Sequence, residues 1–402
     1  MSSQNHSTAV ILSAARTPMG RFQGSLGSLP APRLGAIVVK AAVERAGITD
    51  PAEIDEVLMG NVISAGEGQA PARQAAIFAE LPVSVGATTI NKVCGSGLKA
   101  VMLAAQAIRA GDGDLYVAGG FESMSRAPFL VDARTGSLRF GHAQLTDALL
   151  QDGLWDPFEN WAMGDSAEFI AEEYEVTRQA MDEFALASHQ KAAAAIDSGK
   201  FKAEITPVEL RGRKGEVTIF DTDETPRRDT SLEALAKLKP AFQPNGKVTA
   251  GNAPGLTDGA AALVVASLSK AKALSWQPLA HIVGYTQTAV DPKHLFIAPA
   301  KAIPRLLEKV GWRLADVDLI ELNEAFAAQV LADGYALTDI GWDWRKVNVN
   351  GGAIALGHPI GASGARCLTT LIYALKDRGL KRGIASLCLG GAEAVAMAVE
   401  VD

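Results

Sequence analysis

Three short segments of the chain place a reactive side chain among glycines. They are residues 91–97 around Cys94, residues 357–361 around His358 and residues 386–391 around Cys388. Because glycine has no Cβ, backbone N–H groups and a bulky substrate can come close to the reactive group in such a segment. Two cysteines and a histidine in this setting indicate covalent transfer of an acyl group through a thioester.

Cys94 comes shortly before a predicted helix at residues 98–110. A thiol at a helix N-terminus faces the positive end of the helix dipole, so we expect its thiolate to be favoured and to act as a nucleophile. The alternative is an inert cysteine buried as a small apolar side chain, which is common for free cysteines. Gly95 and Gly97 favour the reactive interpretation. Glycine is a poor helix residue, so its presence at the start of a helix makes most sense if the backbone must approach another group.

Cys388 lies at the end of a predicted strand and is followed by Gly390 and Gly391, which neither packing nor a disulfide requires. A second reactive thiol fits this setting. His358 stands between glycine and proline, a context that can aim an exposed imidazole, although a single histidine is more often structural. Three scattered cysteines without a Cys-x-x-Cys pair do not indicate a zinc site, so we expect no metal.

Asn323 follows an apolar strand pattern and precedes a helical pattern. Its ordinary interpretation is a helix N-cap. Its functional interpretation is an amide that orients a water molecule or a substrate oxygen. The pattern leaves both interpretations open, and Glu324 is equally ambiguous.

The elements that must position these side chains repeat in the two ends of the chain. In each half, a helix closed by glycine precedes an apolar strand, and a glycine-rich turn then opens a second helix, followed by a strand that ends in a glycine pair. The predicted helices cover residues 34–46, 98–110, 302–310 and, after the turn 361–364, the chain up to residue 375; the predicted strands cover residues 54–58, 115–118, 317–322 and 384–389. This alternation predicts mainly parallel sheets covered by helices, and the repeat predicts two similar domains with the site between them.

The middle of the chain, residues 122–246, breaks this rhythm with stretches rich in proline, glycine and charge. We expect an inserted loop region that contains a helix at residues 178–197. Such an insertion could close over a ligand, or it could be a surface elaboration or an oligomer contact. The pattern alone leaves these interpretations open.

The composition of the 402 residues, with 48% hydrophobic and 21% charged residues, describes an ordinary globular protein long enough for two or three domains. The net charge of −7 argues against nucleic acid or an anionic membrane as the main partner. Three cysteines, and an N-terminal segment without a basic stretch followed by an apolar run, predict reduced thiols in the cytoplasm. No apolar stretch approaches the roughly 20 residues that span a bilayer.

With these segments in place, the chain closely resembles the thiolases, specifically the acetyl-CoA C-acetyltransferase group, over nearly its whole length. Besides the three catalytic segments, the resemblance rests on GEGQAPARQ at residues 66–74, GGFESMS at 119–125, LAKLKPAF at 235–242, VTAGNA at 248–253 and NVNGG at 348–352. It implies an α/β thiolase fold of two similar mixed-sheet halves, each a βαβαβαββ unit, with an inserted loop domain. The N-terminal half would take residues 1–121 and 247–270, the loop domain residues 122–246 and the C-terminal half residues 271–402. The resemblance also implies a homotetramer built as a dimer of dimers.

The resemblance implies the reversible Claisen condensation of two acetyl-CoA molecules to acetoacetyl-CoA and CoA, or thiolysis of a 3-ketoacyl-CoA. Cys94 would carry the acyl group, His358 would accept its proton, and Cys388 would move the proton of the substrate methyl group. His358 and a water held by Asn323 would bind the enolate oxygen. The N–H groups of Cys94 and Gly390 would bind the oxygen of the tetrahedral intermediate. CoA thioesters are the substrates, and no cofactor is implied.

Coenzyme A would lie mainly along the inserted region, with Arg227 beside the adenine. The path of the pantetheine and the acyl group would be lined by Met163, Phe242, Ala253, Pro254 and Phe326. Without the resemblance, the side chains of Met163, Phe242 and Phe326 would be interpreted as ordinary core packing.

The chain departs from the family pattern beside the acyl pocket. Ala162 stands where many members have a histidine, Pro254 replaces a serine, residues 294–299 replace a glycine-richer segment, and Ala392-Glu393 replaces glycine or a neutral residue. We therefore expect a pocket that admits more than a two-carbon extension. The alternatives are a 3-ketoacyl-CoA thiolase of broader or longer chain range, a ketoacyl-synthase type of condensing enzyme, against which the second cysteine argues, and a non-catalytic lipid-binding member of the superfamily.

Overall fold

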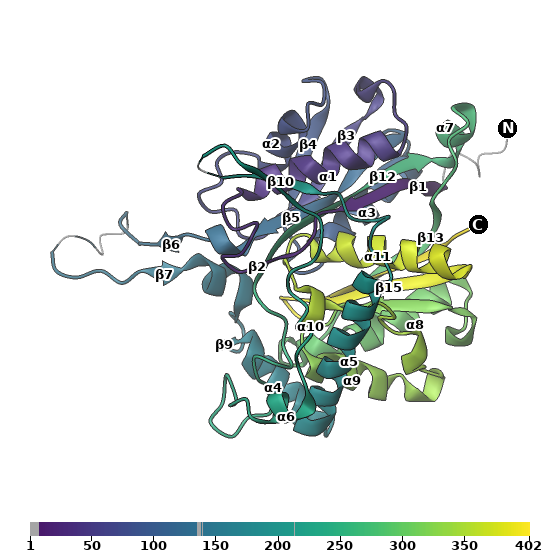
Figure 1. Cartoon of the computed structure of the whole chain (residues 1–402). Helices are drawn as coiled ribbons and strands as arrows, with labels where there is room; N and C mark the ends of the chain where they lie inside the picture. Colours follow the sequence, from purple (N-terminus) through teal and green to yellow (C-terminus); the bar gives the residue numbers. More distant parts are fainter. Residues whose placement is uncertain (1–7, 135–137, 139, 213) are drawn as a thin grey trace.

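The computed structural model describes residues 8–134, 138, 140–212 and 214–402 (Figure 1). Most of the long strands belong to one continuous, curved sheet. Its strands are β1 (Ala9–Arg16), β2 (Gly20–Arg21), β3 (Glu56–Gly60), β4 (Gly86–Ile90), β5 (Leu115–Ser123), β12 (Thr257–Ser267), β13 (Ala280–Ala289), β14 (Leu319–Leu322), β15 (Arg382–Leu389) and β16 (Glu393–Glu400). Their order is β14-β15-β16-β13-β1-β12-β5-β3-β4, and β2 pairs with β12.

The sheet consists of two similar halves that meet where β1 pairs with β13 through Val10 and Ile11. In the N-terminal half, β1, β12 and β5 are antiparallel neighbours and β3 lies parallel to β5. In the C-terminal half, β13, β16 and β15 are antiparallel neighbours and β14 lies parallel to β15. The two halves therefore repeat one topology, as the repeat in the sequence predicted.

The prediction of mainly parallel sheets from the alternation of elements was wrong. Only β3-β4, β3-β5 and β14-β15 are parallel among the described pairs of the sheet. The reason lies in the central strands β12 and β16. β16 returns directly beside β15 as a hairpin, which requires an antiparallel arrangement, and β12 enters between β1 and β5 after the long middle region. The sheet is mixed, as the resemblance to thiolases implied.

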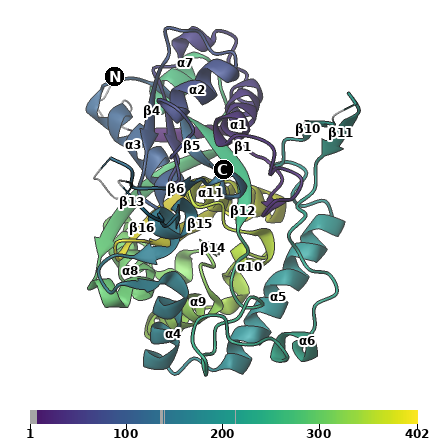
Figure 2. The ribbon, with the colours of Figure 1, turned by 90° about the vertical axis from the view of Figure 1, so that its left-hand side faces the viewer.

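Helices cover both faces of each half of the sheet. They are α1 (Ala31–Arg45), α2 (Pro71–Phe78), α3 (Ser96–Ala110), α4 (Met163–Glu173), α5 (Arg178–Asp197), α6 (Leu232–Ala236), α7 (Leu268–Ala273), α8 (Pro299–Val310), α9 (Ala327–Ala336), α10 (Ala353–Leu356) and α11 (Ser363–Arg378). One buried core joins α3 and α11 to strands of both halves, so this helix pair lies between them. A second core holds α1 and α2 on the outer face of the N-terminal half, and a third holds α8 and α9 on that of the C-terminal half (Figure 2).

Two glycines allow α3 and α11 to cross closely near their N-termini. A Cβ at Gly97 would lie 2.8 Å from the Ala365 nitrogen, and a Cβ at Gly364 would lie 2.4 Å from the Leu98 nitrogen. Any larger residue at either position would push the two helices apart. The start of α3, and with it the Cys94 segment, is therefore held directly against the C-terminal half of the chain.

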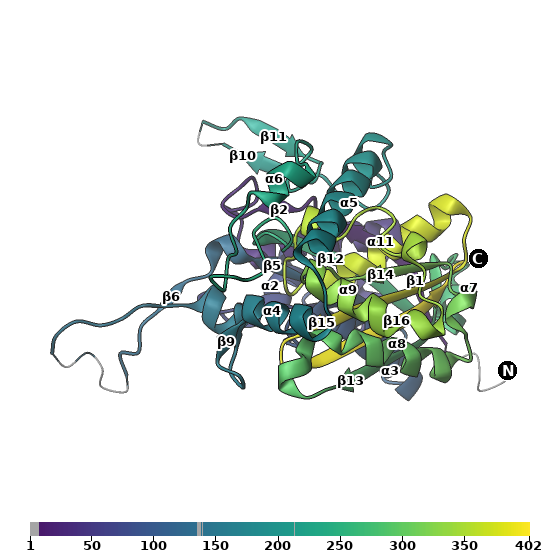
Figure 3. The same cartoon turned by 90° about the horizontal axis from the view of Figure 1, so that it is seen from below.

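Residues 122–246 contribute little to the sheet and contain α4, α5 and α6. Small hairpins are formed there by β6 (Phe129–Leu130) with β7 (Thr146–Asp147), β8 (Trp155–Asp156) with β9 (Trp161–Ala162), and β10 (Val208–Arg211) with β11 (Val217–Phe220). The β6-β7 segment extends far from the body of the molecule (Figures 1 and 3). The bounds predicted for the helix at residues 178–197 are those of α5.

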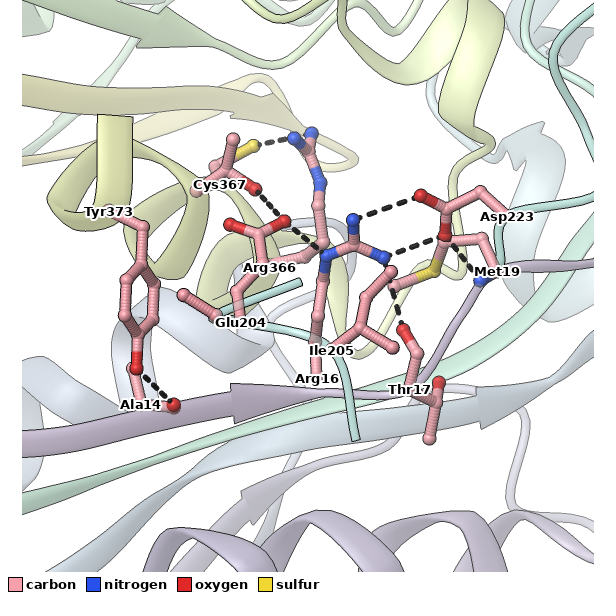
Figure 4. A network of polar contacts seen from close by, with 12 residues as sticks. Ala14, Arg16, Thr17, Met19, Glu204, Ile205, Asp223, Arg366, Cys367 and Tyr373 are labelled. Atoms are coloured by element: carbon pink, nitrogen blue, oxygen red, sulfur yellow. Dashed lines mark hydrogen bonds and ion pairs between the residues drawn. The ribbon is translucent and has the colours of Figure 1, made fainter. Parts of the chain in front are cut away.

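A buried ionic network fastens the chain after α5 to the first strand (Figure 4). Arg16 donates from Nε to Glu204 at 2.5 Å and from both Nη atoms to the Asp223 carboxylate at 2.7 and 2.9 Å. These side chains are at most 1% exposed. Burial opposes the charge of Arg16, but the two carboxylates outweigh burial and hold its pKa above the ordinary value. Among the described residues, no helix is long and apolar enough to cross a membrane.

Candidate active site

Most of the predicted site residues line one cavity of about 180 Å³. Its walls include Cys94, His358, Cys388 and Gly390, which come from both halves of the sheet. The residues predicted along the pantetheine path line it too: Met163, Phe242, Ala253, Pro254 and Phe326. Asn323 and Arg227 are not among its lining residues. The fold thus brings together segments that are hundreds of residues apart in the sequence.

A strained turn holds Cys94 two residues before the start of α3. Val93 has a φ of +46°, which is rare for a β-branched residue and costs conformational energy. Ser96 stabilises this turn, because its Oγ accepts from the Lys92 nitrogen at 2.8 Å and donates to the Val93 oxygen at 2.6 Å. Such strain at one side chain is typical of a functional position.

Burial dominates the electrostatics of the Cys94 thiol. It raises the pKa of Cys94 to about 12, although the backbone N–H groups of Gly390 and of Cys94 itself face the sulfur and act in the opposite direction. The prediction that the thiolate of Cys94 is favoured is therefore wrong. A thiol of this kind needs a base that takes its proton during the reaction.

His358 presents a free basic nitrogen to the same cavity. Its Nδ1 lies 2.5 Å from Ser363 Oγ, and this hydroxyl donates to the Pro359 oxygen at 2.9 Å. Since the hydroxyl proton is engaged there, we assign the ring proton to Nδ1, which leaves the lone pair on Nε2. Nε2 is buried and has no partner among the described residues. Burial, assisted by the charge of Arg366, lowers the pKa of His358 to about 3, so the ring is neutral.

The turn that carries His358 is fixed to the N-terminal half by backbone contacts. The His358 nitrogen donates to Thr257 Oγ1 at 3.1 Å, and the Gly361 nitrogen donates to Glu122 Oε2 at 2.9 Å. A Cβ at Gly120 would lie only 2.0 Å from the Gly361 oxygen. The glycine pair at residues 119–120 was predicted to end a strand, but β5 continues to Ser123, and the glycines make room for the histidine turn.

Cys388 lines the same cavity as Cys94 and is almost completely buried. Burial raises the pKa of Cys388 well above the ordinary value, and the nearby Cys94 adds to this effect. At neutral pH it is therefore a protonated thiol that can donate a proton. The turn after it contains Gly391 and Ala392 with φ of +83° and +60°, so glycine at 391 serves the turn.

The glycines of the two cysteine segments contact each other as well as the cavity. A Cβ at Gly95 would lie 2.6 Å from Leu389 Cδ2, and a Cβ at Gly390 would lie 3.1 Å from Val93 Cγ1. The sequence interpretation assigned this open space to the substrate. Close packing of the Cys94 turn on the hairpin between β15 and β16 accounts for much of it.

Asn323 and Glu324, whose roles the sequence left ambiguous, have different surroundings in the structure. Neither is the N-cap of α9, because that position belongs to Phe326. Glu324 is a structural brace that accepts hydrogen bonds from Ser188 Oγ, Asn348 Nδ2 and the Ile354 nitrogen at 2.7, 2.9 and 3.0 Å. Asn323 Oδ1 lies 3.8 Å from Cys367 Sγ, and its buried Nδ2 has no partner among the described residues. That amide can therefore donate to a water molecule.

A second cavity, of about 370 Å³, adjoins the first, because both are lined by Ala253, Gly255 and Leu256. Arg227 lines it and makes no side-chain hydrogen bond or ion pair with any described residue. The neighbouring Arg228 is paired with Asp197 at 2.8 and 2.9 Å. Arg227 is thus available for an anionic or aromatic ligand, whereas Arg228 is engaged.

Two residues at or beside these cavities were missed at the sequence level. Ser363, the first residue of α11, determines the tautomer of His358, and its only signal was its place in the predicted turn 361–364. His189 lines the second cavity, and its Nδ1 accepts a hydrogen bond from the Arg227 backbone nitrogen at 3.1 Å. Burial and the charge of Arg227 lower the pKa of His189 to about 4. Among the described residues, no group of three or more His, Cys, Asp or Glu side chains is arranged to hold a metal ion.

Comparison with known proteins agrees with this geometry. Models of the thiolase N-terminal and C-terminal domains match residues 9–269 and 276–401. The acetyl-CoA acetyltransferase of Pseudomonas aeruginosa is 56% identical over 98% of this chain and 99% of its own length, and that of Cupriavidus necator is 55% identical over 97% and 98%. The crystal structure of the Bacillus anthracis acetyl-CoA acetyltransferase, 46% identical, superimposes with a TM-score of 0.94 over 98% of this chain and 99% of that one. By sequence and by structure, this chain belongs to the thiolase family.

Proposed function

We propose that this thiolase is an acetyl-CoA acetyltransferase that condenses two acetyl-CoA molecules to acetoacetyl-CoA and CoA, and that it catalyses the reverse thiolysis. One observation carries the proposal. A neutral His358, whose Nε2 has no partner among the described residues, lines the same cavity as Cys94 and Cys388. Relatives at 50–56% identity that carry the name acetyl-CoA acetyltransferase support the choice of substrate.

In the first half-reaction, Cys94 Sγ attacks the thioester carbon of acetyl-CoA while its proton passes to His358 Nε2. Because burial raises the pKa of Cys94 to about 12, its free thiolate is scarce, so the proton passes to His358 as the S–C bond forms. The N–H groups of Cys94 and Gly390 bind the oxygen of the tetrahedral intermediate. Loss of one such donor costs about 3 kcal/mol of transition-state stabilisation.

The intermediate collapses by breaking the bond to the CoA sulfur. Cys388, which is protonated at rest, gives its proton to this leaving thiolate, and CoA departs as a thiol. The products of this step are acetyl-Cys94, a Cys388 thiolate and an imidazolium at His358. The raised pKa of Cys388 makes its thiolate a strong base for the next step.

In the second half-reaction, the Cys388 thiolate removes a proton from the methyl group of a second acetyl-CoA. His358 and a water held by Asn323 Nδ2 bind the enolate oxygen. The enolate carbon attacks the acetyl group on Cys94, the new C–C bond forms and the S–C bond breaks. The Cys94 sulfur then recovers its proton from His358, which returns every group to its starting state.

Coenzyme A lies along the two adjoining cavities in this proposal. Arg227 faces the adenine end, while Met163, Phe242, Ala253, Pro254 and Phe326 contact the pantetheine and the acyl group. The chain divides functionally into an N-terminal half (1–121 and 247–270), a loop domain (122–246) that binds CoA, and a C-terminal half (271–402). A cytoplasmic location stays a prediction from the sequence.

A homotetramer is part of the proposal. The segment that includes β6 and β7 carries side chains that are strongly exposed in the single chain, among them Phe129 at 63%, Phe140 at 102% and Leu145 at 65%. Apolar groups of this size in an extended segment favour contact with another subunit. Sedimentation of the purified protein tests this, and a monomer would contradict it.

A 3-ketoacyl-CoA thiolase of broader chain range is the second candidate. It is favoured by the wall of the first cavity, that of Cys94, which is almost entirely apolar and includes Leu150, Leu154 and Phe296. The same catalytic groups would serve both activities, so only the acyl pocket separates the two candidates.

Acetyl transfer to Cys94 is the decisive experiment. The protein is incubated with acetyl-CoA and its intact mass is measured, followed by peptide mapping and an assay of acetoacetyl-CoA. We expect one acetyl group on Cys94, none in Cys94→Ala, and an unchanged acetyl group in Cys367→Ala. If acetyl-CoA neither acylates Cys94 nor protects it from alkylation, the proposed function is wrong.

A further inference from the structure

An ion pair links the two turns that carry the catalytic cysteines. Lys92 Nζ pairs with Glu393 Oε2, although the residues are 301 positions apart. Lys92 lies two residues before Cys94, and Glu393 is the first residue of β16, directly opposite Leu389 in the β15-β16 hairpin. The pair therefore connects the nucleophile turn of one half of the protein to the Gly390 turn of the other.

Hydrogen bonds hold the backbone on each side of this pair. On one side, the Lys92 nitrogen is bound by Ser96 Oγ at 2.8 Å, next to the strained Val93. On the other side, the Val290 nitrogen donates to the Ala392 oxygen at 2.9 Å, so the hairpin is held by β13. Each turn is thus fastened within its own half of the protein, and the position of one turn relative to the other depends on the contacts between them.

The apolar contacts between the two turns are close packing contacts. Gly95 packs on Leu389, and Gly390 packs on Val93, with no space for a Cβ at the first position and little at the second. Such packing keeps the turns from coming closer, but it does not keep them from sliding or separating. An attraction between charged ends of the two turns supplies the missing restraint.

The relative position of the two turns determines where the Gly390 N–H, a hydrogen-bond donor, lies. The Gly390 N–H faces Cys94 Sγ, and in the proposed reaction it binds the oxygen of the tetrahedral intermediate. An oxyanion donor must be within about 0.5 Å of its best position to act. A small displacement of the hairpin therefore changes the reaction rate more than it changes the stability of the fold.

We propose that Lys92 and Glu393 are positioning residues that clamp the Gly390 turn onto the Cys94 turn and so keep the oxyanion donors in register. The proposal rests on the proposed acetyl-transfer function. The two side chains are 21% and 31% exposed, so solvent weakens the pair and its effect on stability is small. Lys99 interacts electrostatically with both Lys92 and Glu393, so it is a second cation near Glu393. A variant in which Lys92 and Glu393 are exchanged would therefore not be an equivalent arrangement.

A double-mutant cycle tests the clamp. Lys92→Gln, Glu393→Gln and the double variant are compared for the rate of acetylation of Cys94 in single-turnover experiments, for KM and for melting temperature. The control is the same cycle on Lys270 and Glu53, an ion pair of 2.9 Å with exposures of 21% and 43% that lines neither cavity. It has nearly the same solvent environment and no contact with the site.

We expect each single variant at 92 or 393 to acetylate about fivefold to tenfold more slowly, with KM nearly unchanged. The double variant should be no slower than the singles, because the second substitution removes nothing further. The control cycle should leave the acetylation rate unchanged, while melting temperatures fall by similar small amounts in both cycles. High salt should slow the wild-type enzyme toward the variants and leave the variants unaffected.

Unchanged acetylation rates in the 92/393 variants would overturn the clamp, as would losses that add fully in the double variant. These outcomes are distinct from failure of the proposed function, in which the wild-type protein itself would not acetylate at Cys94. A rate loss that merely follows melting temperature in both cycles would also count against the clamp.

Discussion

His358 Nδ1 and Ser363 Oγ are 2.5 Å apart, and this contact determines which ring nitrogen is left for chemistry. Ser363 is the first residue of α11, and its hydroxyl also binds the Pro359 oxygen. A single hydroxyl thus joins the catalytic imidazole to the start of a buried helix. The lone pair of Nε2 stays free because the proton is on the other nitrogen, and His358 lines the cavity of Cys94.

Replacing Ser363 with alanine should lower kcat about tenfold, because the imidazole loses the partner that fixes its tautomer and ring position. KM should change little, since Ser363 does not line either cavity. The control is Thr369→Val on the same helix, where a buried hydroxyl has no partner among the described residues. Steady-state kinetics of both variants decide the matter, and equal activities would contradict the assignment of Nε2 as the base.

The pH dependence of Cys94 alkylation should reveal its buried thiol. Burial raises the pKa of Cys94 to about 12, so the thiolate fraction in the free enzyme grows with every pH unit above neutrality. We expect the rate of iodoacetamide labelling at Cys94 to rise from pH 7 to pH 10 without levelling off. In urea, labelling should level off near the ordinary thiol pKa of about 8.5. A plateau below pH 8 in the folded enzyme would instead indicate a preformed thiolate-imidazolium pair and would contradict this account.

Arg16 should matter for stability far more than its position in β1 suggests. Replacing it with methionine leaves Glu204 and Asp223 buried without their cation, which typically costs about 3–5 kcal/mol. Chemical denaturation of Arg16→Met measures this loss. The control is Arg313→Gln, which removes the partner of Asp316 from a pair whose arginine is 81% exposed and should cost far less stability. Equal losses in both variants would show that the buried network is not the main anchor of this region.

Local patterns predicted the elements of this fold better than they predicted its pairing. The bounds of α5 and the core of α3 follow from apolar periodicity, and the structure has them where they were expected. The antiparallel strands were missed because periodicity says nothing about which strands become neighbours. The end of β5 was missed for a related reason: Gly120 looks like a strand end but is needed where Gly361 passes over the strand.

The site shows the same division between local and tertiary information. Cys94, Cys388 and His358 stand out because reactive residue types occur among glycines. Ser363 and the link between Lys92 and Glu393 carry no such signal, since a hydroxyl and two surface charges are common everywhere. The electrostatics were also beyond the sequence, because burial raises the pKa of Cys94 more than the backbone N–H groups of Gly390 and Cys94 lower it.

Substitution of Cys388 should separate the two half-reactions. In Cys388→Ala, Cys94 should still become acetylated, more slowly, because the leaving CoA lacks only its acid. Exchange of the acetyl-CoA methyl protons with heavy water should fall by about 10²-fold or more, as expected for loss of a general base. Mass spectrometry of acetyl-CoA and of the protein follows both steps in one experiment. Undiminished exchange in Cys388→Ala would contradict the role of Cys388.

Phe296 should limit the length of the acyl group. Its buried ring packs edge-on against Phe326 at 5.4 Å between centroids, and both residues line the cavity of Cys94. We expect the wild-type enzyme to cleave some 3-ketoacyl-CoA thioesters longer than acetoacetyl-CoA. Phe296→Leu should raise kcat/KM for the next longer substrate relative to acetoacetyl-CoA by about tenfold, the usual effect of one methylene in an apolar pocket.

A panel of 3-ketoacyl-CoA thioesters of increasing length in a thiolysis assay measures this preference. Phe201→Leu is the matched control, because Phe201 has the same 3% exposure and lies outside both cavities. Both variants lose a similar apolar volume, so a change of preference confined to Phe296→Leu reports the pocket and not the stability of the fold. Strict preference for acetoacetyl-CoA in the wild type would rule out the broader pocket, and an unaltered preference in Phe296→Leu would remove Phe296 as its determinant.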